Sequence, residues 1–286
     1  MTPSTPAPAT SHPAPESGAP QQPASEPQGC GSSCTDAHDH TGHDHGPTGA
    51  DIVRSFGSGL AIVTMVIPAL AVVMLLSALV LAPATPLPLL LGIGLGGAHL
   101  LVLVLTSLYV SRTERRLAVS PGLLAVRSTV EELLRLAAVL VGALLWPFEH
   151  PGALGVWVGA GAALVWMALA TAQTVSARRR MASPSNWSKN AVATFLAEKV
   201  SVRRSLVLRV LDVIGSAAFQ IGATVLIFLN PLMTVGTIVL SIATGLSTLV
   251  LHRRSSAERA RTPWAYAPFA VGALTLALAI LGISTL

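Results

Sequence analysis

The sequence predicts an all-α, polytopic membrane helix bundle of about seven transmembrane helices, preceded by a disordered N-terminal tail. Of its 286 residues, 52% are hydrophobic and only 11% are charged, which is less than half of the roughly 25% charged residues usual in soluble domains. The apolar residues gather into about seven runs of roughly 20 residues, and a helix of that length crosses a hydrocarbon core about 30 Å thick. These two observations exclude a soluble enzyme.

Residues 1–50 are expected to form the tail. They consist mainly of Pro, Ser, Ala, Thr and Gln and contain almost no bulky apolar side chain that a core could bury. The first 20 residues have neither a basic region nor an apolar core, so we expect no secretory signal peptide. The tail is therefore predicted to stay in the cytoplasm, and residues 51–286 to form the transmembrane domain.

The first four spans are delimited by turn-forming or charged residues. Three prolines separate the first span from the second, and two adjacent glutamates, Glu131 and Glu132, are expected to open the third. The fourth stops at three consecutive arginines that begin at Arg178. The expected bounds are about 57–81, 87–110, 128–147 and 153–176.

Three further spans follow a segment of different character. Residues 183–204 mix apolar side chains at helical spacing with lysine and arginine, which predicts an amphipathic helix, either along the inner membrane face or packed on the cytoplasmic ends of the spans. Asn230 and Pro231 predict a tight turn between spans five and six. Trp264 and Tyr266 lie at the entry of the last span, where aromatic rings favour the interface. The expected bounds are about 205–229, 232–251 and 264–284.

The positions of the basic residues predict the orientation. None of the 18 Lys and Arg residues lies in the turns at 82–88, 149–152 and 230–231. If the basic loops are cytoplasmic, all 18 lie on one side of the membrane, as the positive-inside rule requires. We therefore expect a multi-pass protein of the inner, cytoplasmic membrane, with the N-terminus inside and the C-terminus outside. Basic residues beside spans suit an anionic leaflet, so the net charge of +5 needs no nucleic-acid partner.

The tail concentrates side chains that ligate transition metals. Two thiols and four imidazoles lie within 16 residues, a mixture that Zn, Ni, Co or Cu favours. The spacing lacks the CxxC pair of a folded zinc module, so the affinity would come from ligand density. The alternative is a low-complexity Asp/His segment without a function. The predicted metal ligands are Cys30, Cys34, His38, His40, His43 and His45.

Ionisable side chains inside the spans are candidates for a second polar site, because such groups are rare in membrane interiors. His99 lies deep in the second span, where the alternative is a neutral imidazole bonded to a neighbouring helix. Glu131 is expected to pair with Arg135 at the cytoplasmic start of the third span. Asp212 is expected to offset Arg209, or to bind a cation or proton. The predicted site comprises His99, Glu131, Glu132 and Asp212.

Glycines at a spacing of four residues predict close contacts between helices. Gly92 and Gly96 form one such pair in the second span, and Gly155 and Gly159 form another in the fourth. Each pair provides a narrow face on which a neighbouring backbone can pack.

The favoured functional hypothesis is an integral inner-membrane transport protein, or the membrane subunit of one. In this hypothesis the tail collects a divalent metal and the polar residues of the spans line a path. The first alternative is a non-catalytic scaffold or accessory subunit that binds a membrane-protein or cytoplasmic partner. The second is an intramembrane or lipid-modifying enzyme, which is disfavoured because the sequence arranges no nucleophile beside a base. No catalytic residue and no organic cofactor are predicted.

Overall fold

The computed structural model describes residues 49–82, 87–112, 120–183, 192–193, 201–252, 254, 258 and 262–285. The chain divides into two units, Met1–Asp44 and His45–Leu286, and every described residue belongs to the second. Within these residues the secondary structure is helical and includes no strand, so the predicted all-α class is confirmed. The predicted tail lies outside the described residues, apart from the first residues of the first helix.

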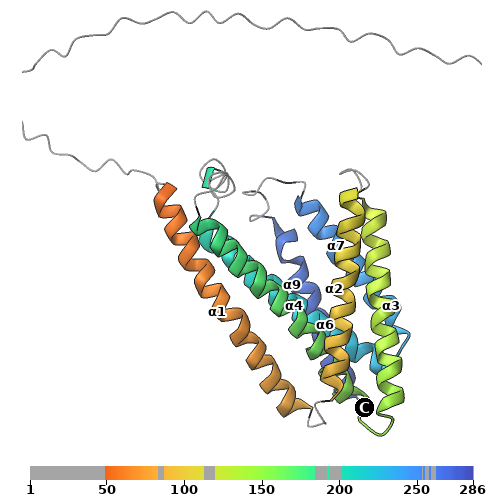
Figure 1. The fold of residues 1–286 in the computed structure, drawn as a ribbon. Coiled ribbons are helices and arrows are strands. Elements are labelled where there is room, and N and C mark those ends of the chain that lie inside the picture. The colour runs from red at the N-terminus through yellow and green to blue at the C-terminus, as the bar shows by residue number, and fades with distance from the viewer. Residues whose placement is uncertain are drawn as a thin grey trace, which may run out of the picture. The chain divides into compact units, whose positions relative to one another are not determined.

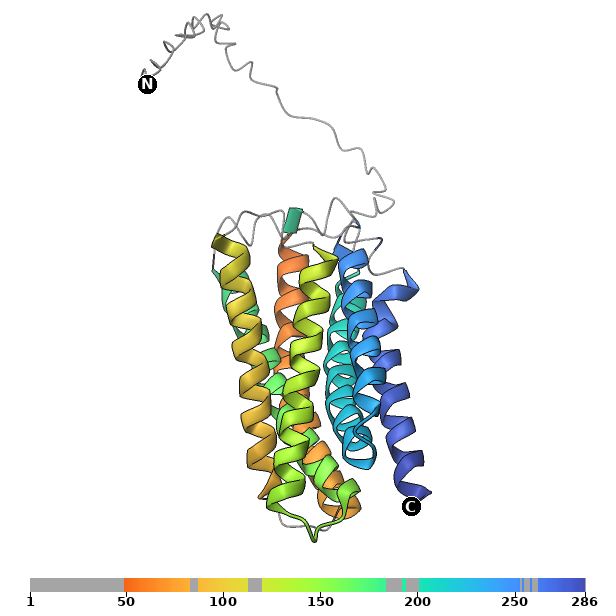
Figure 2. The ribbon, with the colours of Figure 1, turned by 90° about the vertical axis from the view of Figure 1, so that its right-hand side faces the viewer.

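The described residues form seven long α-helices and one short 3-10 helix. Successive long helices run in opposite directions between the same two ends of the bundle (Figure 2). The elements are α1 (Gly49–Leu81), α2 (Pro88–Arg112), α3 (Pro121–Leu145), α4 (Pro151–Ala182), α6 (Val202–Leu229), α7 (Met233–His252), η2 (Pro263–Tyr266) and α9 (Ala267–Ser284).

Six segments of the described chain are long and apolar enough to cross a membrane: α1, α2, α4, α6, α7 and the last segment, η2 with α9. The most apolar stretch is 61% buried in α4 and 50% buried in α6, but only 17 to 22% buried in the other four. The helices α4 and α6 therefore form the centre of the bundle, around which the others are arranged (Figure 1). The exposed apolar faces of the outer helices indicate a lipid bilayer as the environment.

The helix α3 departs from the expected third span. It begins at Pro121 and not near 128, so its charged residues lie inside the helix. These charges keep α3 out of the six apolar segments, although it matches α2 in length at 25 residues and packs against α2, α6 and α7. The expectation that every basic residue lies at one face is consequently wrong for Arg135, which is buried in the bundle beside an acidic partner.

The helices α1 and α4 also extend beyond their expected bounds. The first begins at Gly49 and not near 57, and α4 continues from 176 to Ala182 through the three arginines. Backbone hydrogen bonds within a helix are local, so a helix does not stop where the apolar run stops. Most of segment 183–204 lies outside the described residues, and residues 202–204 belong to α6.

Close glycine contacts join the central helices. A Cβ atom added at Gly159 of α4 would lie 2.6 Å from the Cα of Ile221 in α6. One added at Gly96 of α2 would lie 2.7 Å from the Cβ of Val165 in α4. Gly92 and Gly155 are as tightly packed against the same two neighbouring helices. Both predicted glycine pairs are therefore confirmed as helix contacts, and both lie within the chain itself.

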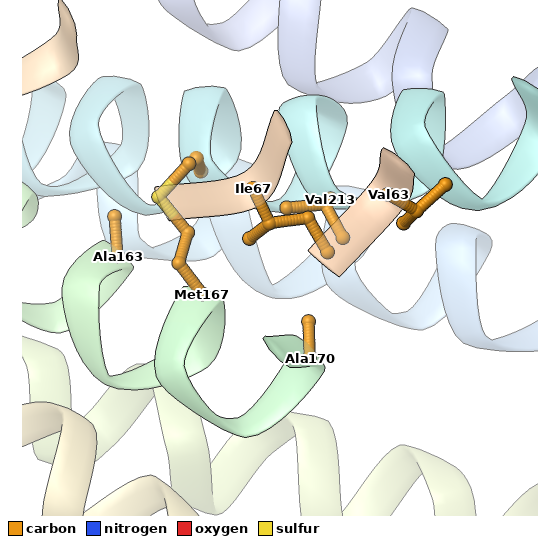
Figure 3. Close-up of a cluster of buried hydrophobic side chains, with 7 residues drawn as sticks. Val63, Ile67, Ala163, Met167, Ala170 and Val213 are labelled. Carbon is orange, nitrogen blue, oxygen red and sulfur yellow. The ribbon is translucent and has the colours of Figure 1, made fainter. Parts of the chain in front are cut away.

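An apolar cluster fills the space between α1, α4 and α6 (Figure 3). Ile67 of α1 is fully buried, and its side chain packs with Met167 of α4 and Val213 of α6. At the opposite end from the start of α1, the indole Nε1 of Trp157 donates to the carbonyl of Ala82 over 2.9 Å. The α1, α4 and α6 helices are thus held as one unit.

The turn between α6 and α7 is as tight as the sequence predicts. Asn230 ends α6, and its backbone N–H donates to the carbonyl of Leu226. Its side-chain oxygen accepts from the N–H of Leu232 over 3.0 Å, and α7 begins at the next residue. The asparagine side chain thereby supplies an acceptor where the helical ladder is interrupted.

Candidate functional site

The charged residues of α3 lie near the middle of the helix. From Pro121 to Glu132 the helix rises by about 16 Å, and from Glu132 to Leu145 by about 20 Å, at 1.5 Å per residue. The sequence-based placement of the glutamates at the cytoplasmic start of this span is therefore wrong. The helix begins about two turns earlier, at Pro121, so the glutamates lie near its middle.

A buried ion pair occupies this position. The Nη2 atom of Arg135 lies 3.3 Å from Oε1 of Glu132, and each side chain is only 1% exposed. The same Nη2 donates to Oε1 of Gln220 on α6 over 2.8 Å. The guanidinium also lies over the ring of Phe219, with Cζ 5.3 Å from its centroid, at cation–π distance. Arg135 therefore connects α3 to α6 through polar contacts in the centre of the bundle.

The hydrogen-bonding capacity of this pair is only partly used. Among the described residues, Oε2 of Glu132 has no hydrogen-bond partner, and neither do Nε and Nη1 of Arg135. The indole Nε1 of Trp166, on α4, has none either. Buried polar atoms nearly always find partners, and a partly satisfied buried network is unfavourable for stability. These four atoms consequently require an explanation other than packing.

These side chains line a cavity of about 210 Å³. Glu132 and Arg135 of α3 and Gln220 of α6 form part of its wall, with Trp166 from α4 and Thr244 from α7. Residues of α9 line it as well, so five helices contribute to one polar cavity. A cavity needs a volume of roughly 10 to 15 Å³ to hold one water molecule. This cavity is many times larger, so it can hold a small solute.

A second ion pair lies on the same helix, one turn toward its beginning. The Nε atom of Arg127 donates to Oε1 of Glu131 over 2.7 Å, and the two side chains are 31% and 15% exposed. The expected pairing of Glu131 with Arg135 is therefore wrong. Because α3 begins at Pro121, Arg127 is available to Glu131 a full turn earlier, and Arg135 is left for Glu132.

His99 joins α2 to α3. Its Nε2 lies 2.9 Å from the backbone carbonyl oxygen of Glu131, and the side chain is 1% exposed. A carbonyl oxygen only accepts, so Nε2 must carry the proton of the imidazole. Nδ1 has no partner among the described residues. His99 does not belong to the wall of the polar cavity, and its contact with α3 is to the backbone.

Asp212 is not brought together with the other predicted residues. Its Oδ2 lies 3.8 Å from Nη1 of Arg209, and both side chains are partly exposed, at 46% and 37%. Arg209 also donates to Gln173 of α4. These residues line a separate cavity of about 150 Å³, which shares two residues, Trp166 and Ser216, with the wall of the larger cavity. Asp212 thus lies next to the buried pair's cavity without contacting the pair.

Metal ligands do not converge among the described residues, where no group of three or more His, Cys, Asp or Glu side chains could hold an ion. The predicted intramembrane residues are divided between a helix contact, a cavity wall and a partly exposed ion pair. The six predicted Cys and His ligands of the tail lie outside the described residues. Metal binding by the tail therefore stays a prediction.

No protein-family model matches the chain. No curated protein and no solved structure matches it either.

Several residues of the cavity wall are absent from the predicted site, among them Arg127, Trp166 and Gln220. Arg127 precedes Glu131 by four residues, a spacing that favours pairing on one helix face, but it was assigned to a loop. Trp166 lies near the middle of α4, far from the interfaces where tryptophan is enriched. That unusual depth is the signal in the sequence that could have identified Trp166 as a polar group facing other helices.

Proposed function

We propose that the chain is a membrane transport protein, or the membrane subunit of one, and that the cavity at Glu132 and Arg135 is its solute site. One observation carries the proposal: a fully buried ion pair lines a cavity at mid-bundle and leaves three of its own polar atoms without partners. Charged groups inside a membrane are unfavourable by several kcal/mol unless they are paired, and they mark substrate pathways in many membrane proteins.

The neighbouring cavity suggests how a solute would reach this site. Arg209 and Asp212 lie partly exposed at the first turns of α6, and their cavity is separated from the larger one by Trp166 and Ser216. We propose that a rearrangement of the side chains between the two cavities opens a polar route from one end of the bundle to Arg135.

The scaffold alternative receives less support. In that alternative the small-residue faces of spans two, four and six are helix interfaces, and the basic loops bind lipid or a cytoplasmic partner. On spans two and four, Gly92, Gly96, Gly155 and Gly159 pack against helices of the same chain, so these faces are not left for a partner. The enzyme alternative needs a nucleophile beside a base. The hydroxyl of Thr244, in the cavity wall, donates to the backbone carbonyl of Leu240 over 2.9 Å. Its proton is therefore not directed at an acidic or imidazole side chain that could act as the base.

The orientation forms part of the proposal. Arg54, Arg112 and Arg178 lie at the end of the bundle where α1 begins and where α2 and α4 end. The turn residues 146–150 and 230–232, at the other end, include no lysine or arginine. This asymmetry supports a cytoplasmic N-terminus, and with seven crossings the C-terminus would lie outside.

The tail adds a second, separable element. A divalent Zn, Ni, Co or Cu ion bound by the thiols and imidazoles of residues 30–45 would be collected on the cytoplasmic side. The wall of the polar cavity already balances two guanidiniums with two carboxylates, so a bound cation would add an uncompensated charge. The tail is therefore proposed to sense or buffer the metal, and the cavity to take a different solute.

Flux through reconstituted protein tests the proposal. Full-length protein would be placed in liposomes and supplied in parallel with Zn²⁺, Ni²⁺, small organic anions, small amines and small amino acids, with protein-free liposomes as the control. We expect one class of solute to enter faster than in the control. If every class enters at the control rate, the protein does not transport these solutes and the proposal fails.

A further inference from the structure

We infer that the polar cavity at Glu132 and Arg135 binds a small zwitterion, whose carboxylate is held by Arg135 and whose ammonium group is held by Glu132. The inference rests on the proposed function and specifies the substrate class of the same site.

The charge balance of the cavity wall favours a ligand without net charge. Two guanidiniums, of Arg127 and Arg135, face two carboxylates, of Glu131 and Glu132. A net anion or cation in this cavity would leave one charge uncompensated at low dielectric, which is unfavourable by several kcal/mol. A zwitterion adds two opposite charges and leaves the sum at zero.

The unpartnered atoms define what the ligand must offer. Nε and Nη1 of Arg135 and Nε1 of Trp166 are donors, and they require acceptor oxygens. A carboxylate meets this requirement best because both of its oxygens accept hydrogen bonds and its charge is opposite to that of the guanidinium. Oε2 of Glu132 is an acceptor and requires a donor. An ammonium group supplies one, and charge-assisted hydrogen bonds are roughly twice as strong as those between neutral groups.

The short distance between the guanidinium of Arg135 and the carboxylate of Glu132 bears on how far apart the ligand's carboxylate and ammonium groups lie. Nη2 of Arg135 and Oε1 of Glu132 are 3.3 Å apart, and the residues are three positions apart on one helix. Because the two charged side chains lie this close together, the ligand that we infer carries its ammonium and carboxylate groups on the same or neighbouring carbon atoms, as an α- or β-amino acid does.

The cavity volume limits the remainder of the ligand. At about 210 Å³ the cavity is smaller than the roughly 300 to 1,000 Å³ that hold drug-sized ligands. The hydroxyl residues Ser216, Ser241 and Thr244 line it with the aromatic ring of Phe219. This volume and this wall suit an amino acid with a small side chain better than one with a long charged side chain.

Calorimetry with matched probes tests the inference on the full chain in lipid nanodiscs. Alanine carries both charged groups, propionate lacks the ammonium group, and ethylamine lacks the carboxylate. We expect alanine, glycine and serine to bind, and propionate and ethylamine to bind at least about tenfold more weakly, since one hydrogen bond to a charged group changes affinity by roughly 10-fold or more.

Variants test the contact of the ammonium group with Glu132 and the contact of the carboxylate with the N–H of Trp166. Glu132→Gln should weaken alanine binding at least about tenfold, while Trp166→Phe, which keeps an aromatic ring and removes only the N–H, should weaken it severalfold. Glu149→Gln and Arg178→Gln, at the two ends of the bundle, remove the same charge types away from the cavity and should leave the affinity unchanged. The Trp166→Phe variant keeps the test valid if Glu132→Gln fails to fold.

Two results would overturn the inference. One is the absence of binding for all three amino acids, which would mean that the cavity holds water alone or another solute. The other is propionate or ethylamine binding as tightly as alanine. If liposomes then take up a different class of solute, and this uptake depends on Arg135, the proposed transport function stands and only the zwitterion inference fails. If no solute is taken up, the proposed function and the inference both fail.

Discussion

The buried pair predicts a strongly non-additive effect of mutation on stability. Glu132→Gln leaves the guanidinium of Arg135 buried without a charged partner, and Arg135→Gln does the same to the carboxylate of Glu132, each side chain being 1% exposed. Removal of one partner of a buried pair destabilises a protein by roughly 3 to 5 kcal/mol. For a chain of this size that change lowers the melting temperature by about 6 to 20 °C. The double variant leaves no uncompensated charge, so it should lose much less than the sum of the two single variants.

The assay is thermal unfolding of purified full-length protein in one detergent, with the two single variants and the double variant compared as a cycle. The control is the pair of Arg209 and Asp212, whose side chains are 37% and 46% exposed and 3.8 Å apart. Exposed pairs contribute roughly 0.2 to 1 kcal/mol, so Asp212→Asn should lower the melting temperature by no more than a few degrees. Single variants at Glu132 and Arg135 as mild as this control, or a double variant equal to their sum, would refute the buried pairing.

Three further predictions concern other parts of the chain. Gly159→Val should destabilise the protein by about 1 to 3 kcal/mol because its Cβ would lie 2.6 Å from a backbone atom of α6, whereas Gly94→Ala, at a glycine with nothing within 4 Å, should be neutral or stabilising; equal unfolding temperatures would contradict the helix contact. His99→Ala should cost about 1 kcal/mol in thermal unfolding through its lost bond to α3 and leave solute flux intact, so a loss of flux in folded protein would place His99 on the path. Replacement of Cys30 and Cys34 by serine in the full chain should reduce the zinc bound per molecule, measured by elemental analysis, and unchanged zinc would exclude these thiols as ligands.

The helices were largely predictable because length and apolar composition determine them. The prolines at 83–88 and Asn230 place the adjoining helix ends, the end of α1, the start of α2, the end of α6 and the start of α7, within a few residues. The start of α3 could not be placed in this way. Its first turns contain polar residues, and a membrane span is recognised by its apolar run, so Pro121 was assigned to a loop.

The site was only partly predictable, for a related physical reason. His99, Glu131 and Glu132 were identified because ionisable groups are unexpected inside a membrane, and the structure places all three at the contact of α2 and α3 or at the cavity wall. Their partners depend on how the helices rotate against one another. Gln220 of α6 and Trp166 of α4 meet Arg135 and its cavity only through that rotation, which no local pattern in the sequence specifies.

The dependence of solute flux on the buried pair tests the central claim most directly. Initial rates of uptake would be measured in liposomes containing wild-type protein, the Glu132→Gln/Arg135→Gln double variant and the Arg178→Gln control, after each is shown to be folded. The account predicts that the initial rate of uptake is lower in the double variant than in the wild-type protein by a factor of about ten or more, and that the control keeps the wild-type rate. Equal rates in the wild-type protein and the double variant would contradict the claim that this cavity is the solute site.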